Sequence, residues 1–277
     1  MDNTNIAFIG CGNMGQGLIG GLIANGHHPD NIHGADPDPE KRDLISKIYK
    51  VRVYAESTRA IEHAEVVMLA VKPQLMMQTL SEIATEIKKK SPLVISIAAG
   101  IRLATLEAGL GGNPPVIRAM PNTPALIRAG ASALYANTSV TPEQRHLAED
   151  IMRSVGLAVW LDDESGMDTV TALSGSGPAY FFLIMEVMEK AARQLGLPAE
   201  QARLLTVQTA LGAAKMAEAS KLDAATLRQQ VTSPGGTTER ALKVLMEKGH
   251  IEVLFLEALL AAKRRSEELA TLTGRPE

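Results

Sequence analysis

The first stretch whose residues could do chemistry is a glycine-rich turn close to the start of the chain. Residues 10–15 read Gly-Cys-Gly-Asn-Met-Gly, a G-x-G-x-x-G spacing whose glycines permit a tight turn, close backbone approach to a pyrophosphate and close helix packing. The apolar run Asn5 to Gly10 leads into it, and the helical segment Met14 to Asn25 follows. This context predicts a dinucleotide site, with a plain glycine-rich turn as the alternative. Cys11 is interpreted as a small loop residue rather than a redox centre, because no second cysteine could resolve an oxidised thiol.

A carboxylate about 20 residues beyond that turn is the second candidate. Asp36 follows the strand-like run Asn31 to Ala35, where an acidic side chain accepts hydrogen bonds from adenosine ribose hydroxyls and favours NAD over NADP. Lys41 and Arg42, one turn into the next helical segment, could compensate for the repulsion of a 2'-phosphate, so the choice of dinucleotide stays open. The alternative is that residues 36–40 are only a turn and a helix start.

The third candidate is a turn near the C-terminus, residues 232–240, which read Thr-Ser-Pro-Gly-Gly-Thr-Thr-Glu-Arg. Gly236 and Glu239 have the spacing of an N-cap and its third helical residue. Unbonded first-turn amides and the positive end of the helix dipole favour a carboxylate or phosphate there. Three hydroxyl groups would be extra donors, those of Ser233, Thr237 and Thr238. An ordinary helix–helix turn is the alternative.

Alternating strands and helices must position the first two candidates. Strand-like runs are predicted at 5–10, 31–35, 51–54, 66–71, 93–97, 116–119, 132–135 and 156–161, with helical segments at 14–25, 40–48, 57–63 and 142–154 between them. Such alternation predicts a mostly parallel sheet, with ligands bound outside the carboxyl ends of the strands. Lys72, after the fourth strand, would meet a ligand there or be a solvated lysine. Asn122, after the sixth, would face the ligand or satisfy loop backbone.

From about residue 163 the pattern is helical only. Helices are predicted at 167–195, 199–219, 224–230, 237–248 and 251–272. The fold class is therefore α/β, with a Rossmann-type domain at 1–162 followed by an all-helical domain at 163–277. The segments Ala179 to Met188 and Val253 to Ala262 are too apolar for surface helices of a small domain, which predicts burial against another subunit in an obligate oligomer.

Composition narrows the function classes. A chain of 277 residues is long enough for two domains, and a net charge of -3 gives no electrostatic footprint for nucleic acid or an anionic membrane. One cysteine excludes an internal disulfide framework, and Glu186 and Glu257 interrupt the most apolar C-terminal runs. The N-terminus does not have the pattern of a signal peptide. We expect a cytoplasmic protein with no metal centre, no nucleic-acid partner and no membrane span.

With both halves laid out, the chain resembles the pyrroline-5-carboxylate reductase family nearly end to end. The resemblance is carried by residues 8–15, 70–73, 120–124, 173–180, 211–216 and 233–238. It implies NADH- or NADPH-dependent reduction of 1-pyrroline-5-carboxylate to L-proline, the last step of proline biosynthesis. It also implies a homodimer with intertwined helical domains, often assembled as a pentamer of dimers, and makes residues 163–277 a dimerisation and substrate-binding domain.

The family's site residues carry over onto matching positions of this sequence. The resemblance implies cofactor contacts at Gly10, Cys11, Gly12, Asn13, Met14, Gly15, Asp36, Ser57, Ala70, Val71, Lys72, Pro73, Ile97, Ala98 and Ala99. It implies a substrate site at Ser233, Gly235, Gly236, Thr237 and Thr238, with Glu164 nearby. The Thr238 hydroxyl would lie at the ring nitrogen as the catalytic group. Where this chain has Ser57 and Gln230 the family usually has Asn, and the family often has a small residue at the position of Asp36.

Two other functions remain open from the sequence. A related Rossmann-plus-helical 3-hydroxyacid dehydrogenase would recruit a lysine or histidine to protonate an alkoxide. Lys190 or Lys215 could be nominated, although both are better interpreted as solvated helix residues. A non-catalytic protein that senses the dinucleotide is the alternative from another class. Turnover of an imine with a reduced dinucleotide would distinguish a pyrroline-5-carboxylate reductase from both of these alternatives.

Overall fold

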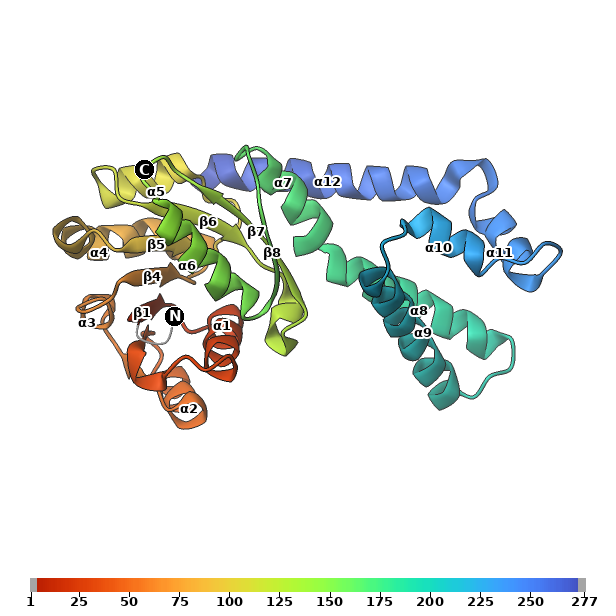
Figure 1. Ribbon diagram of the computed structural model, residues 1–277, viewed down its shortest axis with the longest axis horizontal. Coiled ribbons are helices and arrows are strands. Elements are labelled where there is room, and N and C mark those ends of the chain that lie inside the picture. The colour runs from red at the N-terminus through yellow and green to blue at the C-terminus, as the bar shows by residue number, and fades with distance from the viewer. Residues whose placement is uncertain (1–3, 274–277) are drawn as a thin grey trace. The chain divides into compact units, whose positions relative to one another are not determined.

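The computed structural model describes residues 4–273 (Figure 1). The chain divides into two compact units: the sheet unit, Met1–Ser176 with Ala261–Glu277, and the helical unit, Gly177–Leu260. Residues 1–3 lie outside the described residues. They belong to the N-terminal segment for which no signal-peptide pattern is expected. The functional division predicted between residues 162 and 163 stays a prediction.

The sheet unit is built on one eight-stranded sheet in the order β3-β2-β1-β4-β5-β6-β7-β8. All neighbouring strands are parallel except β6 and β7, which are antiparallel. The strands are β1 Ile6–Ile9, β2 Ile32–Ala35, β3 Arg52–Tyr54, β4 Val66–Leu69, β5 Leu93–Ser96, β6 Val116–Met120, β7 Gly130–Ala136 and β8 Gly156–Trp160. The predicted Rossmann-type, mostly parallel sheet is confirmed, because the order turns outward on both sides of β1 as a doubly wound sheet requires.

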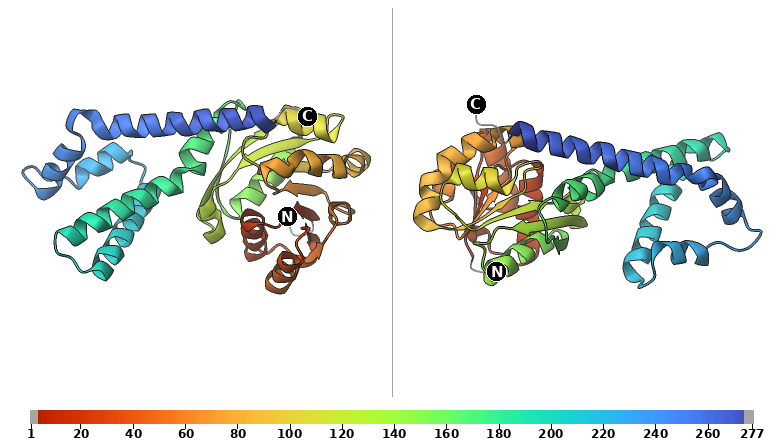
Figure 2. Two further views of the ribbon diagram at one scale, coloured as in Figure 1. Left: turned by 180° about the vertical axis from the view of Figure 1, so that it is seen from behind. Right: turned by 90° about the horizontal axis from the view of Figure 1, so that it is seen from above.

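Helices cover both faces of this sheet (Figure 2). They are α1 Asn13–Ala24, α2 Pro39–Tyr49, α3 Ser57–Ala60, α4 Met76–Lys90, α5 Leu103–Leu110, α6 Pro142–Arg153 and α7 Gly166–Val170. Alternate residues of β1 point to opposite faces: Ile6 and Phe8 join a core with α1, α2 and α6, whereas Ala7 and Ile9 join a core with α3, α4 and α5. Burial on both faces explains why the central strands read as continuous apolar runs.

The helical unit holds α8 Gly177–Gln194, α9 Ala199–Ala219, α10 Ala224–Gln230, α11 Thr237–Leu245 and the first part of α12 His250–Thr273. The predicted helix at 167–195 is interrupted between α7 and α8 by a π-helical turn, Thr171–Gly175. The last residue of this turn is Gly175, where a Cβ would lie 2.6 Å from Cε of Met120 on β6. Helix α11 ends before the predicted Lys248, which adopts a left-handed conformation with φ 55°.

Large apolar side chains are exposed along α8, α9 and α12 of the helical unit. Phe181 and Phe182 of α8 are 64% and 65% exposed, and Leu254 of α12 is 64% exposed. By length and composition alone, the run Gly166–Gln194 would pass as a membrane span, with a mean hydropathy of 1.2. A single run of this kind is weak evidence for a membrane span, and it carries the Glu186–Lys190 ion pair within α8.

Candidate active site

The glycine-rich turn joins β1 to α1 and packs against the end of β4. Gly10 has φ +91°, and a Cβ there would lie 2.8 Å from the carbonyl carbon of Ala70. A Cβ on Gly15 would lie 2.7 Å from the carbonyl oxygen of Gly10. Both positions therefore require glycine, and this requirement brings the turn against Ala70 and Val71, two of the predicted cofactor residues.

Gly12 differs from its two neighbours in the motif. A Cβ at Gly12 would meet no heavy atom within 4 Å among the described residues, so the space above this N-cap residue is open. The amides of Asn13, Met14 and Gly15 form the first turn of α1 and have no protein acceptor in the described part of the chain, because the helical ladder starts with Gln16 N–H to Gly12 C=O. A diphosphate fits this open helix N-terminus.

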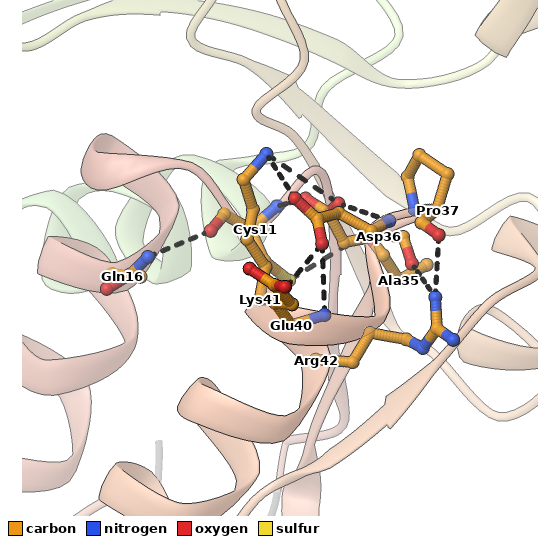
Figure 3. Close-up of polar contacts among 9 residues, drawn as sticks. Cys11, Gln16, Ala35, Asp36, Pro37, Glu40, Lys41 and Arg42 are labelled. Carbon is orange, nitrogen blue, oxygen red and sulfur yellow. Dashed lines mark hydrogen bonds and ion pairs between the residues drawn. The ribbon is translucent and has the colours of Figure 1, made fainter.

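Asp36 directly follows β2, and its side chain faces the backbone of Cys11 in the glycine-rich turn (Figure 3). Its side chain is 7% exposed. Oδ2 accepts the backbone N–H of Cys11 at 3.0 Å, and Oδ1 accepts that of Asp38 at 3.0 Å. The sequence predicted only a ribose contact for this carboxylate. The Asp36 carboxylate also fixes the backbone of the turn. Each oxygen keeps a lone pair to which a ribose hydroxyl could donate.

Arg42 and Lys41 occupy this same end of the sheet in different ways. Nη1 of Arg42 donates to the carbonyl oxygens of Asp36 and Pro37, at 2.9 and 2.8 Å, so its guanidinium group stiffens the loop (Figure 3). Nζ of Lys41 lies 3.6 Å from Oδ2 of Asp38 and 4.0 Å from Oδ1 of Asp36, and its side chain is 48% exposed. Lys41 is therefore the cation that remains available to an incoming anion.

Cys11 is a packing residue within the turn. The side chain is fully buried, Sγ donates to the carbonyl oxygen of Ala35, and a Cβ on Gly34 would lie 2.9 Å from this sulfur. Burial, and then the negative charge of Asp36, raise the pKa of the Cys11 thiol to about 12. The thiolate needed for redox chemistry is thus absent near neutral pH.

We predict that iodoacetamide will not alkylate Cys11 in the folded protein at neutral pH, because the thiol is buried and protonated. The chain unfolded in urea should be alkylated completely under the same conditions and serves as the control. Mass spectrometry of the intact protein counts the added groups. Rapid labelling of the folded form would restore the redox interpretation.

The other predicted cofactor residues lie where neighbouring strands end. Ser57 begins α3 three residues after the end of β3, and Lys72 and Pro73 follow β4. Ile97, Ala98 and Ala99 follow β5, and the N–H of Ile97 donates to Leu69 at 3.1 Å, which holds this loop beside the end of β4. The structure thus gathers these residues at the carboxyl edge of the sheet, where parallel sheets bind ligands.

Glu164, a predicted substrate residue, belongs to a polar cluster that the sequence analysis did not find. Its Oε1 accepts Nη1 of Arg118 at 2.6 Å and the backbone N–H of Leu103 at 2.7 Å. The Arg118 side chain is 8% exposed although it stands in the middle of β6. The arginine inside an otherwise apolar strand could have predicted this cluster, because a buried guanidinium group requires a polar or charged partner.

The turn before α11 keeps part of its hydrogen-bonding capacity. Gly235 N–H donates to Oε2 of Glu239 at 2.9 Å, and Gly236 N–H donates to the carbonyl oxygen of Ser233 at 3.0 Å. Gly236 is the N-cap, as predicted. Within residues 4–273 the amides of Thr237 and Thr238 have no acceptor, so these two remain for an anion.

Two further polar residues have structural roles. Asn122 accepts the N–H of Ala131 at 2.9 Å and donates to the carbonyl oxygen of Ser174 at 2.9 Å, so it satisfies loop backbone. Lys190, nominated for an alkoxide-protonating enzyme, forms an exposed ion pair with Glu186 one turn earlier on α8. Neither arrangement adds a catalytic group to the candidate site.

Comparison with known proteins covers the whole chain. Residues 164–269 match the family model described as pyrroline-5-carboxylate reductase dimerisation, and residues 5–100 match the model described as NADP oxidoreductase, coenzyme F420-dependent. The pyrroline-5-carboxylate reductase of Pseudomonas aeruginosa is 50% identical over 274 residues, covering 99% of this chain and 100% of the relative. The Escherichia coli enzyme of that name is 40% identical over 266 residues, covering 96% and 98%.

Solved structures show the same likeness. A pyrroline-5-carboxylate reductase from Coxiella burnetii superposes with a TM-score of 0.93 at 46% identity, covering 97% of this chain and 99% of that one. A Plasmodium falciparum pyrroline carboxylate reductase with NADP bound gives a TM-score of 0.85 at 30% identity, covering 98% and 99%. These likenesses extend through both the sheet unit and the helical unit.

Proposed function

Because the chain belongs to the pyrroline-5-carboxylate reductase family, we propose that its glycine-rich turn binds the cofactor and that the turn before α11 binds the substrate. The protein is an oxidoreductase that reduces 1-pyrroline-5-carboxylate to L-proline with NADH or NADPH, the last step of proline biosynthesis. This conclusion rests on the 50% identity, over 99% of this chain, to the Pseudomonas aeruginosa enzyme of that name.

The sheet unit fits a dinucleotide. The positions of Gly10 and Gly15 have no space for a side chain, whereas the space beside Gly12 is open among the described residues. The first-turn amides of α1 can donate to the diphosphate there. We propose the adenosine end at Asp36 and Ser57, and the nicotinamide end at residues 70–73 and 97–99. When bound, the reduced nicotinamide supplies the hydride for the C=N carbon of the substrate.

For the substrate carboxylate we propose the N-terminus of α11. The amides of Gly235 and Gly236 already donate within the turn, so the amides of Thr237 and Thr238 are the main donors, with the exposed Ser233 hydroxyl beside them. The positive end of the α11 dipole adds to the attraction. A substrate contact from Glu164 would use Oε2, because Oε1 is committed to Arg118 and Leu103.

The Thr238 hydroxyl is the proposed catalytic group. A cyclic imine is readily protonated, and its cation accepts a hydride without a covalent intermediate, so positioning and charge placement can supply most of the acceleration. Thr238 would orient the ring nitrogen or donate a proton to it, while the neighbouring amides hold the carboxylate. This division of tasks uses only groups within one helical turn.

We predict that Lys41→Ala raises the KM for NADPH several-fold more than the KM for NADH, because Lys41 is the available cation near Asp36 and would pair with a 2'-phosphate. Lys47→Ala is the matched control, since it removes the same charge from an exposed position at the other end of α2. Steady-state kinetics with each cofactor measures the ratio. An equal change for both cofactors would exclude the 2'-phosphate role of Lys41.

The chain forms a homo-oligomer, since residues 164–269 match a dimerisation family. We propose a homodimer formed through the apolar faces of α8, α9 and α12, assembled further as a pentamer of dimers, and a cytoplasmic location. The exposure of Phe181, Phe182 and Leu254 in the single chain supports a large apolar interface. The functional division into a cofactor domain, 1–162, and a dimerisation and substrate domain, 163–277, is part of the same proposal.

The proposed function is tested by following cofactor oxidation with 1-pyrroline-5-carboxylate and with a panel of other imines and ketoacids. We expect oxidation of NADH or NADPH that depends on 1-pyrroline-5-carboxylate and yields one equivalent of L-proline. Turnover confined to a 3-hydroxyacid or its ketoacid would contradict the assignment, and so would tight cofactor binding without turnover of any member of the panel.

A further inference from the structure

We propose that Asp168 is a positioning residue which, with Ser266 of α12, fixes the loop at residues 97–102. This loop carries the proposed nicotinamide contacts Ile97, Ala98 and Ala99, so the inference rests on the proposed function for its catalytic consequence. Asp168 stands in α7 and Ser266 in the part of α12 that belongs to the sheet unit. None of the roles assigned above uses either side chain.

Asp168 joins the loop to α12 through both of its oxygens. Oδ2 accepts Nη2 of Arg102 at 3.1 Å, and Oδ1 accepts the hydroxyl of Ser266 at 2.7 Å. Asp168 and Ser266 are each 4% exposed. A carboxylate this deeply buried needs hydrogen-bonding partners, and because Arg102 and Ser266 supply them the three side chains form one unit.

A second contact near the loop comes from the turn that precedes α7. Glu164 accepts the N–H of Leu103, the residue directly after Arg102. Glu164 lies in the turn that leads into α7, four residues before Asp168, so two carboxylates close together in the sequence hold the adjacent residues Arg102 and Leu103. Arg118 fixes Glu164 in turn, with Nη1 2.6 Å from Oε1.

The loop also packs directly on α12. Gly100 has φ +75°, and a Cβ there would lie 3.4 Å from Cβ of Leu269 and 3.5 Å from the backbone nitrogen of Ala270. Ser266 lies one helical turn before Ala270. The last turns of α12 therefore hold both the backbone of the loop and, through Asp168, its Arg102 side chain.

Different contacts hold the loops at the two ends of the proposed cofactor site, the nicotinamide end and the adenosine end. Asp36 and Arg42 hold the glycine-rich turn at the end of β2 and make no hydrogen bond or ion pair with Asp168 or Ser266 among the described residues. Loosening the Asp168 contacts should let the loop at 97–102 move while the adenosine end stays intact. A shift of about 1 Å in such a loop can lower the rate of a positioned reaction roughly 100-fold.

The test compares Ser266→Ala with Arg265→Ala. The control removes an exposed ion pair to Glu268 from the adjacent residue of the same helix. For Ser266→Ala we expect faster amide hydrogen exchange at residues 97–103 in the protein without ligands, and a kcat for 1-pyrroline-5-carboxylate lowered about tenfold or more. The affinity for ADP-ribose, which reports the adenosine end, should change less than about twofold, and Arg265→Ala should match the wild type throughout.

Ser266→Thr retains the hydroxyl and should restore most of the protection at residues 97–103. Asp168→Asn is a second variant and should show the larger effect, because it removes the charge that Arg102 pairs with. Exchange at 97–103 that is the same in Ser266→Ala and Arg265→Ala would overturn the proposal. A parallel loss of ADP-ribose affinity and kcat would also overturn it, since that indicates a general loss of structure. If the wild type fails to reduce 1-pyrroline-5-carboxylate, the proposed function fails, and hydrogen exchange still decides whether Asp168 fixes the loop.

Discussion

Replacing Thr238 by alanine is expected to lower kcat for 1-pyrroline-5-carboxylate about 100-fold or more, while the KM for NADPH and the Tm stay close to those of the wild type. The size follows from the usual contribution of a positioned proton donor, 10²- to 10⁴-fold. The small effect on stability follows from the position of Thr238 in the first turn of α11, where its hydroxyl has no protein partner among the described residues. Steady-state and single-turnover kinetics measure both quantities.

Two matched variants sharpen this result. Thr238→Ser keeps the hydroxyl and should retain most of the activity. Thr237→Ala removes an exposed hydroxyl one residue earlier in the same turn, and should raise the KM for the substrate with little change in kcat. An unchanged kcat for Thr238→Ala, or equal effects of the two alanine variants, would exclude Thr238 as the group at the ring nitrogen.

Replacing Gly12 by alanine is expected to weaken binding of NADH and NADPH about 10- to 100-fold without destabilising the fold. A Cβ at Gly12 meets no heavy atom within 4 Å in the described structure, and φ -70° suits alanine, so only a bound diphosphate would be displaced. Losing one or two hydrogen bonds to a charged group accounts for the expected size. A fluorescence titration gives the affinity, and thermal unfolding is expected to show a change below about 1 kcal/mol.

Gly10→Ala is the contrasting variant, because its Cβ would lie 2.8 Å from the Ala70 carbonyl carbon at φ +91°. It should lower the free energy of unfolding by about 3 kcal/mol or more as well as cofactor affinity. If Gly12→Ala bound the cofactor normally, the diphosphate would not pass over this residue, and the proposed orientation of the dinucleotide would be wrong.

The fold of the sheet unit follows from local sequence signals. Runs such as Ile6–Ile9 and Val66–Leu69 are apolar throughout because helices bury both of their faces. Gly10 directly follows the first run, and Lys72 and Pro73 follow the second after two small or apolar residues. The cap at Gly236 was likewise predictable, since glycine is a favoured N-cap and Glu239 stands three residues later. Patterns this local do not depend on distant parts of the chain.

Contacts between distant parts of the chain were not predictable. Asp36 was expected to meet a ribose, but its bond to the N–H of Cys11, 25 residues earlier, depends on how β2 lies beside the glycine-rich turn. The close approach of Gly175, in the π-helical turn, to Met120 joins residues 55 positions apart. Helical periodicity reports only the face that a residue occupies and not the side chain that will meet it.

The polar cluster around Asp168 shows the same limit more strongly. Ser266 and Asp168 are 98 residues apart, and Arg102 is a further 66 residues before Asp168. Each residue alone reads as an ordinary helix or loop residue. Only the completed fold shows that one carboxylate holds two segments, and this is why the residues with the clearest positioning role were absent from the sequence-based site.

The proposed reaction transfers a hydride from a reduced nicotinamide to the C=N carbon of 1-pyrroline-5-carboxylate. The most direct measurement uses NADPH or NADH deuterated at the transferable position and analyses the product by mass spectrometry and NMR. We predict L-proline with a single deuterium on Cδ, the former C=N carbon, and one cofactor oxidised for each proline formed. Unlabelled proline, deuterium at another carbon, or cofactor oxidation without proline would contradict the account.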